Sequence, residues 1–412
     1  MTTKFLLISA ANFSKLLSSL VFIKVSASNL GPEGIGLIGH FISFVSLIFA
    51  FSGGGISNGI ITLTSKNKND ETLLQDLSDN FQSISLFCSL FISLLIFIFS
   101  KNISLLLFKS EEYFWSINIL ASAVLFFSYI NFYQSFLNGL LKTYDFSLIQ
   151  IFGNFLSIII SIILINSYGF NGVLIAFIFG FLSLIFPILI HYCYRKPVIF
   201  RKISLKKDIL GSSFKYSFIF LMGALSVPLI EFIIREIIIR ILGYADAGYW
   251  QAVNRISVAH FSFYVSFFTF YLLPRLKEVS REAQIKLLYL EYFKLILPIF
   301  VILSSGFYYF SNFFIPILLS DKFLFIADFL PYQFFGDFMK VIAYSLGMVA
   351  VSRALIWYIL PLELIQFFLL ICITTLFISN DASLVSVYRA YSISYVIYSF
   401  LMLIVFTKLI KK

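Results

Sequence analysis

The sequence predicts an all-α integral membrane protein with about twelve transmembrane helices in two six-helix bundles. Three observations support this fold class: the composition is strongly apolar, the apolar residues form runs long enough to span a bilayer, and a short motif recurs in the second half of the chain. Of the 412 residues, 60% are hydrophobic and 12% are charged. A soluble domain has about a quarter of its residues charged, so most of this chain's surface faces something other than water.

Twelve segments offer the length of about 20 mostly apolar residues that crosses the hydrocarbon core. Gly, Asn, Asp and Pro, which end helices, occupy the short connections between them, and no stretch remains for a water-soluble domain. The first segment carries Lys15 in its middle and lacks a cleavage site, so it is expected to be retained rather than removed as a signal peptide. The segments run roughly over 5–28, 35–62, 81–100, 114–140, 146–166, 172–194, 214–241, 248–273, 288–312, 325–351, 355–378 and 384–407.

The positive charge is distributed unevenly between alternate connections. With the N-terminus inside, eighteen Lys and Arg residues fall on the inner side, and the outer side holds three, Lys101, Lys109 and Lys322. Such a bias sets membrane orientation, so both termini are predicted to be cytoplasmic. The formal net charge of +10 is then a topology signal, and no nucleic-acid partner is expected.

An internal repeat divides the chain. Leu30-Gly31 to Gly36 recurs as Leu242-Gly243 to Gly248 at an offset of 212, with an acid in each turn. The repeat predicts an N-terminal bundle at 1–194, a cytoplasmic basic linker at 195–212 and a C-terminal bundle at 213–412. Because six helices return the chain to the same side, both halves share one orientation, an arrangement typical of transporters.

Candidate substrate-binding residues are the ionisable groups within the spans, since these usually face a bundle interior or a wet cavity. Lys15 shares a helical face with Asn12 and Ser19. Lys24 lies nine residues further on, about half a turn around an ideal helix. Lys24 could equally extend its amine to the outer interface.

In the second half, Arg235 and Arg255 are the candidate cations of the seventh and eighth segments. Arg235 stands four residues after Glu231, so the two could simply neutralise each other, and Pro228 could make this helix a hinge. Arg255 has no acidic residue within a turn. An unpaired guanidinium needs a partner from another helix or from a ligand, and a phosphate matches its planar fork.

Asp337 and Lys340 complete the set of predicted substrate-binding residues. Both share one face of the tenth segment with Gln333 and Tyr344. Their spacing of three also allows a local ion pair, which is the structural alternative.

Signals of catalysis, metal binding and nucleotide binding are absent from the sequence. The three His and three Cys residues have no metal-ligand spacing, and no nucleophile–base motif is recognisable. The glycine-rich run 53–59 lacks the Lys-Ser/Thr ending of a phosphate loop and sits within an apolar span. We therefore predict no catalytic residue, no metal and no cofactor, and no feature identifies a coupling ion.

Several short motifs spread over most of the chain resemble Wzx-type flippases of the multidrug/oligosaccharidyl-lipid/polysaccharide (MOP) exporter superfamily. They are Leu30-Gly31-Pro32-Glu33-Gly34-Ile35-Gly36, Gly55-Ile56-Ser57-Asn58-Gly59, Gly248-Tyr249-Trp250-Gln251, Tyr271-Leu272-Leu273-Pro274 and Gly336-Asp337-Phe338-Met339-Lys340-Val341.

This resemblance implies two six-helix bundles around a central cavity that opens alternately to either side of a bacterial cytoplasmic membrane, as in MATE-like transporters. It also implies an undecaprenyl-pyrophosphate-linked glycan as cargo, such as an O-antigen or related repeat unit. A polysaccharide polymerase and a chain-length regulator would be the protein partners. The mostly basic candidate residues suit an anionic pyrophosphate.

Two other functions compete with this interpretation. A drug/cation antiporter of the same superfamily should present cavity carboxylates, whereas the candidates here are mostly basic. A membrane glycosyltransferase or O-antigen polymerase needs a sizeable outer loop with catalytic groups, and the outer connections here are only about a dozen residues long.

Overall fold

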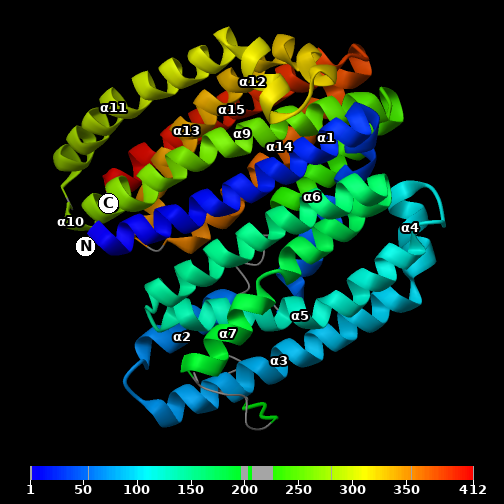
Figure 1. Cartoon of the computed structure of the whole chain (residues 1–412). Coiled ribbons are helices and arrows are strands. Elements are labelled where there is room, and N and C mark those ends of the chain that lie inside the picture. The colour runs from blue at the N-terminus through cyan, green and yellow to red at the C-terminus, as the bar shows by residue number, and fades with distance from the viewer. Residues whose placement is uncertain are drawn as a thin grey trace. The chain divides into compact units, whose positions relative to one another are not determined.

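The computed structural model describes residues 2–53, 55–195, 203–206, 226–279, 281–353 and 355–411. Within these ranges the chain is helical and has no β-strand, which confirms the predicted all-α class (Figure 1). The helices of the first half are α1 (Thr2–Ser52), α2 (Ser57–Lys66), α3 (Glu71–Ile98), α4 (Ser100–Phe108), α5 (Phe114–Gly139), α6 (Thr143–Leu182) and α7 (Ile185–Arg195).

A helix over 226–241 opens the described part of the second half. It is followed by α9 (Tyr244–Phe267), a π-helical turn (Phe268–Leu272), α10 (Leu273–Glu278), α11 (Glu282–Tyr309), α12 (Ser311–Leu318), a 3₁₀ stretch (Asp321–Phe329), α13 (Leu330–Ser352), α14 (Ile356–Asn380) and α15 (Leu384–Ile410).

Two of these helices each contain two predicted spans. Within α1, Gly31 adopts φ 67° and ψ −171°, and Pro32 follows it. Within α6, Gly169 adopts φ 55° and ψ −127°. Only glycine takes such positive φ values without strain, so each helix breaks at a predicted connection. The connections at 30–34 and 166–171 are thereby confirmed.

The chain is a multi-pass membrane protein. Eight helical stretches of the described residues are long and apolar enough to cross a membrane. Two of the eight run through the breaks in α1 and α6, and so cover two predicted spans each. These eight stretches therefore cover ten of the predicted spans. The helix over 226–241 and α9 correspond to the remaining two, so the helices fit the predicted twelve-helix arrangement in two bundles. Residues 214–225 of the seventh predicted segment lie outside the described residues.

The chain forms two compact units. The first comprises Met1–Leu30 and Leu37–Phe232, and the second comprises Gly31–Gly36 and Ile233–Lys412. In the first unit, α3 packs along α5, with Phe81, Ile130 and Phe136 in the core between them. In the second, α13 packs along α15 and contributes to a core that includes Tyr292 and Val341.

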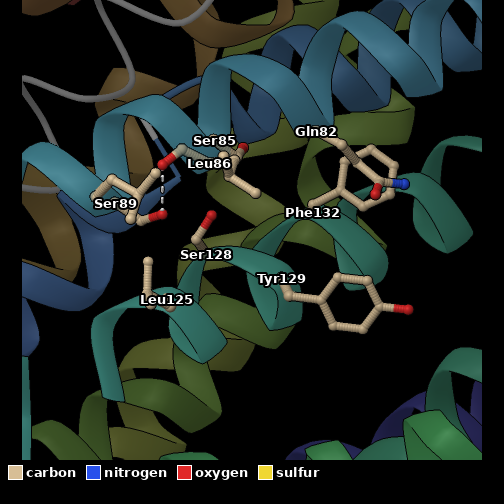
Figure 2. A pocket seen from close by; sticks show the side chains of 9 residues that line it. Gln82, Ser85, Leu86, Ser89, Leu125, Ser128, Tyr129 and Phe132 are labelled. Carbon is tan, nitrogen blue, oxygen red and sulfur yellow. Dashed lines mark hydrogen bonds between the residues drawn. The ribbon is translucent and has the colours of Figure 1, made fainter. Parts of the chain in front are cut away.

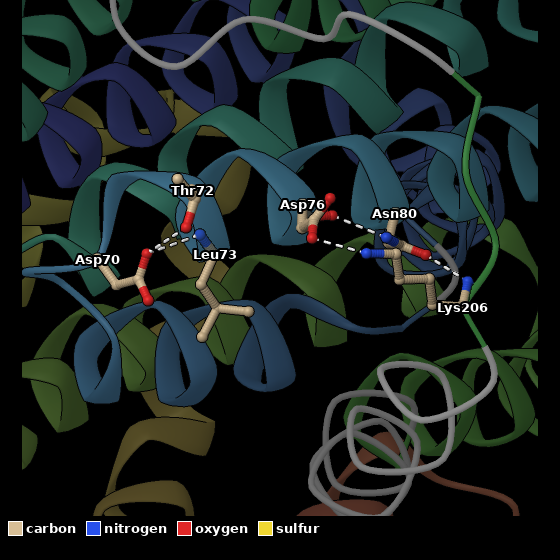
Figure 3. Close-up of polar contacts among 6 residues, drawn as sticks. All are labelled: Asp70, Thr72, Leu73, Asp76, Asn80 and Lys206. Carbon is tan, nitrogen blue, oxygen red and sulfur yellow. Dashed lines mark hydrogen bonds and ion pairs between the residues drawn. The ribbon is translucent and has the colours of Figure 1, made fainter.

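Part of the predicted basic linker lies on the polar face of α3, within the first unit (Figure 3). The backbone N–H groups of Ser204 and Lys206 donate to Ser83 Oγ at 3.0 Å and to Asn80 Oδ1 at 2.5 Å. Lys206 Nζ also donates to Asp76 Oδ2 at 2.6 Å. These contacts fix residues 204–206 along the first unit.

The same helix begins with a capping carboxylate. Asp70 accepts hydrogen bonds from the backbone N–H of Leu73 at 3.0 Å and from Thr72 Oγ1 at 2.7 Å (Figure 3). Because both donors favour the ionised form, they lower the pKa of Asp70. The cap therefore acts at neutral pH and is lost only in acid, as the pH falls through that lowered pKa.

Candidate functional site

Lys15 is presented on an exposed polar face of α1. Asn12 and Ser19, predicted to share this face, are exposed as well. No hydrogen bond or ion pair engages Lys15 within the described residues. The neighbouring Ser14 fixes the helix, since its hydroxyl accepts from Asn154 Nδ2 of α6 at 3.0 Å and donates to the Ala11 carbonyl at 2.8 Å. These contacts hold the backbone at Lys15 beside α6, while no hydrogen bond or ion pair of the described residues fixes the amine at the end of its side chain.

Lys24 occupies a different environment. It is half-buried, and the nearby Ser26 is completely buried. The exposed polar face of α1 therefore does not extend to this level. Lys24 and Lys15 therefore lie on different faces of α1, in agreement with the half-turn between them in the sequence.

The first unit has a cavity between α3 and α5 that sequence reasoning missed, lined by hydroxyl and apolar side chains without a charged group (Figure 2). It has a volume of about 200 Å³. Ser89 Oγ donates to the Leu86 carbonyl of its own helix at 3.0 Å, and Ser85 Oγ donates to the Gly53 carbonyl at 3.4 Å. Small hydroxyl residues allow transmembrane helices to approach closely, and the spacing of serines along α3 was the available signal. The lining residues are Gln82, Ser85, Leu86, Ser89, Leu90, Leu125, Ser128, Tyr129 and Phe132.

A second cavity of the first unit, of about 470 Å³, lies between α6 and α7 and has mostly apolar walls. Its polar edge contains His191, which is 3.4 Å from Asp145 through Nε2. The other ring nitrogen of His191 lies 2.6 Å from the hydroxyl of Tyr133. Sequence reasoning assigned His191 no role, because these partners lie 46 and 58 residues away along the chain.

Asp337 is the centre of a buried hydrogen-bond network in the second unit. Its side chain is 1% exposed. Oδ1 accepts from the Ser257 hydroxyl of α9 at 2.8 Å, the Tyr391 hydroxyl of α15 at 2.7 Å and Gln333 Nε2 at 3.3 Å. Oδ2 is buried without a hydrogen-bond partner in the part of the chain that the structure describes. One carboxylate thus joins three helices and keeps one oxygen unused.

Lys340 does not pair with Asp337, although their spacing allowed it. No ion pair joins the two among the residues described. The amine lies instead 4.5 Å from the ring centre of Phe261 and 5.5 Å from that of Tyr395. Aromatic faces attract a cation without neutralising it, so Lys340 keeps its charge beside these two rings.

Arg255 is half-buried on α9 and has no hydrogen bond or ion pair within the described ranges. Two hydroxyls further along the chain bond to the backbone instead. Ser262 Oγ donates to the Ala259 carbonyl at 2.7 Å, and Thr269 Oγ1 donates to the Val265 carbonyl at 2.9 Å. Arg255 is therefore a cation whose hydrogen-bonding capacity is unused.

Arg235 is completely buried, with an exposure of 0%. Its guanidinium donates to Gln251 Oε1 at 2.5 Å and lies 5.5 Å from the ring centre of Trp250. Arg235 therefore ties the helix over 226–241 to α9, and a ligand cannot reach it in this conformation. On the same helix, Glu236 and Arg240 form an i,i+4 ion pair at 2.8 Å.

The predicted residues thus form separate groups. The first unit presents Lys15, and in the second unit α9 and α13 carry Arg255, Asp337 and Lys340. Among the described residues, no three His, Cys, Asp or Glu side chains are placed to hold a metal ion. The arrangement can bind an anion through Lys15 and Arg255, which form no ion pair within the described residues.

Comparison with known proteins supports this interpretation. A family model described as "Polysaccharide biosynthesis protein" matches residues 1–280. The chain is 24% identical over 391 residues to the lipid III flippase of Escherichia coli (strain K12), covering 94% of each chain. The same identity and coverage are found with the lipid III flippase of Shigella flexneri.

The fold is that of MATE transporters. An inward-facing multidrug resistance MATE family transporter of the MOP superfamily matches with a TM-score of 0.80 at 16% identity, over 97% of this chain and 96% of that one. An outward-facing MATE family transporter matches with a TM-score of 0.69 at 14% identity, over 99% and 95% of the two chains.

Proposed function

Because this chain belongs to the polysaccharide biosynthesis protein family, we propose that it is a flippase for a lipid-linked oligosaccharide. Its cargo is an undecaprenyl-pyrophosphate-linked glycan, an O-antigen or a related surface polysaccharide repeat unit, and it moves from the cytoplasmic to the periplasmic leaflet by alternating access. The observation that carries the proposal is the presence of cations with unused hydrogen-bonding capacity on membrane helices, Arg255 above all.

The anionic headgroup sets the physical problem. Even one charge at mid-bilayer costs at least ~2.5 kcal/mol on insertion scales, so an unaided pyrophosphate cannot cross. Lys15, Arg255 and Lys340 lower that barrier by offering hydrogen bonds and positive charge, while the lipid tail stays in the bilayer. Lys24 and Arg235 join them in other conformations of the transport cycle. Asp337 limits the affinity so that the headgroup is released.

The proposal includes a location and an orientation. The protein lies in the bacterial cytoplasmic membrane with both termini inside, and the bundles at 1–194 and 213–412 move during transport. A polysaccharide polymerase and a chain-length regulator act on the translocated units. Reporter fusions after Lys206 should be active in the cytoplasm and fusions after Asn171 in the periplasm; exchanged locations would overturn the orientation.

A drug/cation antiporter is the second candidate, because it shares the fold. It would need an accessible carboxylate for a cationic drug. Asp337 is 1% exposed, and one of its oxygens already accepts three hydrogen bonds. Within the described residues Lys15 and Arg255 have no such partners, which supports an anionic cargo.

Deletion of the gene tests the proposed function directly. The lipid-linked repeat unit should accumulate in the cytoplasmic leaflet, where added periplasmic glycosidases cannot reach it, and a plasmid copy of the gene should reverse the accumulation. Normal export in the deletion strain, together with increased sensitivity to cationic drugs, would favour the antiporter instead.

A further inference from the structure

The larger cavity of the first unit, between α6 and α7, has walls that suit a lipid chain. Its volume of about 470 Å³ lies within the range of ~300–1,000 Å³ that is typical of small-molecule sites. All of its lining residues belong to Thr143–Tyr194, a stretch long and apolar enough to cross a membrane. Phe152, Phe155 and Phe186 on its walls are large, apolar and exposed. Apolar side chains avoid water, and the medium around a membrane-spanning stretch is lipid hydrocarbon.

The polar groups of this cavity lie together at one end. Tyr144 and Asp145 stand in the first turn of α6, and His191 and Tyr194 stand in the last turns of α7. Both tyrosines are exposed, and tyrosine is enriched where a membrane helix meets the water interface. The cavity therefore leads from the headgroup level of the bilayer into its apolar part.

Asp145 makes the polar end of the cavity acidic. Its Oδ2 atom lies 3.4 Å from His191 Nε2, and His191 Nδ1 lies 2.6 Å from the Tyr133 hydroxyl. A neutral imidazole donates through one ring nitrogen and accepts through the other. We assign the hydroxyl as the donor to Nδ1, which places the ring proton on Nε2, toward the carboxylate. The three side chains then carry one negative charge, and Oδ1 of Asp145 accepts no hydrogen bond within the described residues.

We propose that this cavity binds a phospholipid with a primary ammonium headgroup. One acyl chain lies along the apolar walls, and the ammonium group donates to Asp145. A hydrogen bond between two ionised groups is among the strong ones, and it is stronger still beside hydrocarbon than in water. Lys142, which is exposed three residues before Asp145, supplies a cation for the phosphate of the same headgroup. The site is thus complementary to a zwitterion, with a carboxylate for its positive end and an amine for its negative end.

An anionic headgroup does not fit the same end of the cavity. A lipid without an ammonium group would place its negative charge beside Asp145, and the two like charges repel each other. A pyrophosphate would be repelled in the same way. The cavity is therefore a lipid site separate from the residues proposed to bind the cargo.

Lipid titration tests the site. The full chain, purified in detergent, would be titrated with dioleoyl phosphatidylethanolamine, and the bound lipid would be counted by native mass spectrometry. Dioleoyl phosphatidylglycerol is the comparison, because it has the same acyl chains but an anionic headgroup without nitrogen. The unmodified chain should bind phosphatidylethanolamine about tenfold more tightly, the order of effect that a hydrogen bond to a charged group gives. The midpoint of thermal unfolding should rise with it, since a ligand of the folded state stabilises that state. Equal affinity for the two lipids would overturn the proposal.

Three variants separate the headgroup contact from the chain contact. Asp145→Asn should abolish most of the preference while an acyl chain still binds. Glu71→Gln is the matched control, because Glu71 is an exposed carboxylate in the first turn of α3, and it should keep the preference. Ile190→Trp adds bulk to the cavity wall and should weaken the binding of both lipids.

Two results with these variants would contradict the site. A preference that persists in Asp145→Asn would show that the carboxylate does not select the headgroup. Undiminished binding of both lipids to Ile190→Trp would show that they bind outside the cavity. If Asp145→Asn fails to insert, Ile190→Trp decides the proposal, because it leaves the carboxylate and its partners in place.

Discussion

The two units differ in the chemistry of their polar interiors. In the first unit, the cavity between α3 and α5 is lined by serines, Gln82, Tyr129 and apolar side chains, and among the described residues the buried charged one is Asp79, which is 1% exposed near the start of α3. In the second unit, the Asp337 carboxylate and the Arg235 guanidinium are 1% and 0% exposed. Charges in membrane spans are more costly than hydroxyls and therefore indicate function more strongly. We expect the second unit, which also carries Arg255 and Lys340, to contribute more to recognition of the headgroup.

Charge reversal at Arg255 is the largest expected effect. Arg255→Glu should lower glycan export roughly a hundredfold, two factors of ten at about 1.4 kcal/mol each, because the variant repels the pyrophosphate instead of binding it. The measurement is export by strains with equal amounts of the protein in the membrane. Arg240→Glu is the control, since Arg240 is 74% exposed. Loss of insertion in the Arg255 variant would show that Arg255 has a structural role.

Lys15 should matter less. Neutralising the amine in Lys15→Gln removes one cation from the first unit and leaves Arg255 and Lys340 in place, so we expect about a tenfold loss of export, or about 1.4 kcal/mol. The direct comparison is Arg255→Gln at matched expression. If Lys15→Gln costs as much as Arg255→Gln, the two units share recognition equally, and the inequality argued above is wrong.

The sequence predicted the elements better than their contacts. The breaks at Gly31 and Gly169 could be located because Gly and Pro interrupt apolar runs in any context. The isolation of Arg255 could be inferred from the absence of an acid within one turn. Tyr391 could not be identified as a partner of Asp337, because it is 54 residues away and the register between α13 and α15 depends on packing. The contact between Arg235 and Gln251 could not be predicted for the same reason, because it depends on how two helices pack.

Asp337 should have a moderate effect on stability. Asp337→Ala removes the acceptor that Ser257 and Tyr391 share, and a buried donor left without a partner costs about 1–3 kcal/mol. The midpoint of thermal unfolding in detergent should therefore fall. Asp337→Asn keeps an acceptor oxygen, so its unfolding midpoint should lie between those of the alanine variant and the unmodified chain. Equal midpoints for all three would show that this network does not stabilise the second unit.

The smallest effect is expected where the first unit does use charge, in the contact between Lys206 and Asp76. The two side chains are 51% and 34% exposed, and ion pairs this open contribute about 0–1 kcal/mol. A double-mutant cycle with Lys206→Gln and Asp76→Asn should thus give a coupling free energy within that range, and salt should reduce it further. Asn80→Ala should cost more than either variant, because Asn80 is buried and its side-chain oxygen accepts the Lys206 N–H. A coupling above about 1 kcal/mol, or an Asn80 variant as stable as the unmodified chain, would mean that charge stabilises the first unit more than hydrogen bonding does. The contrast drawn between the two units would then have to be abandoned.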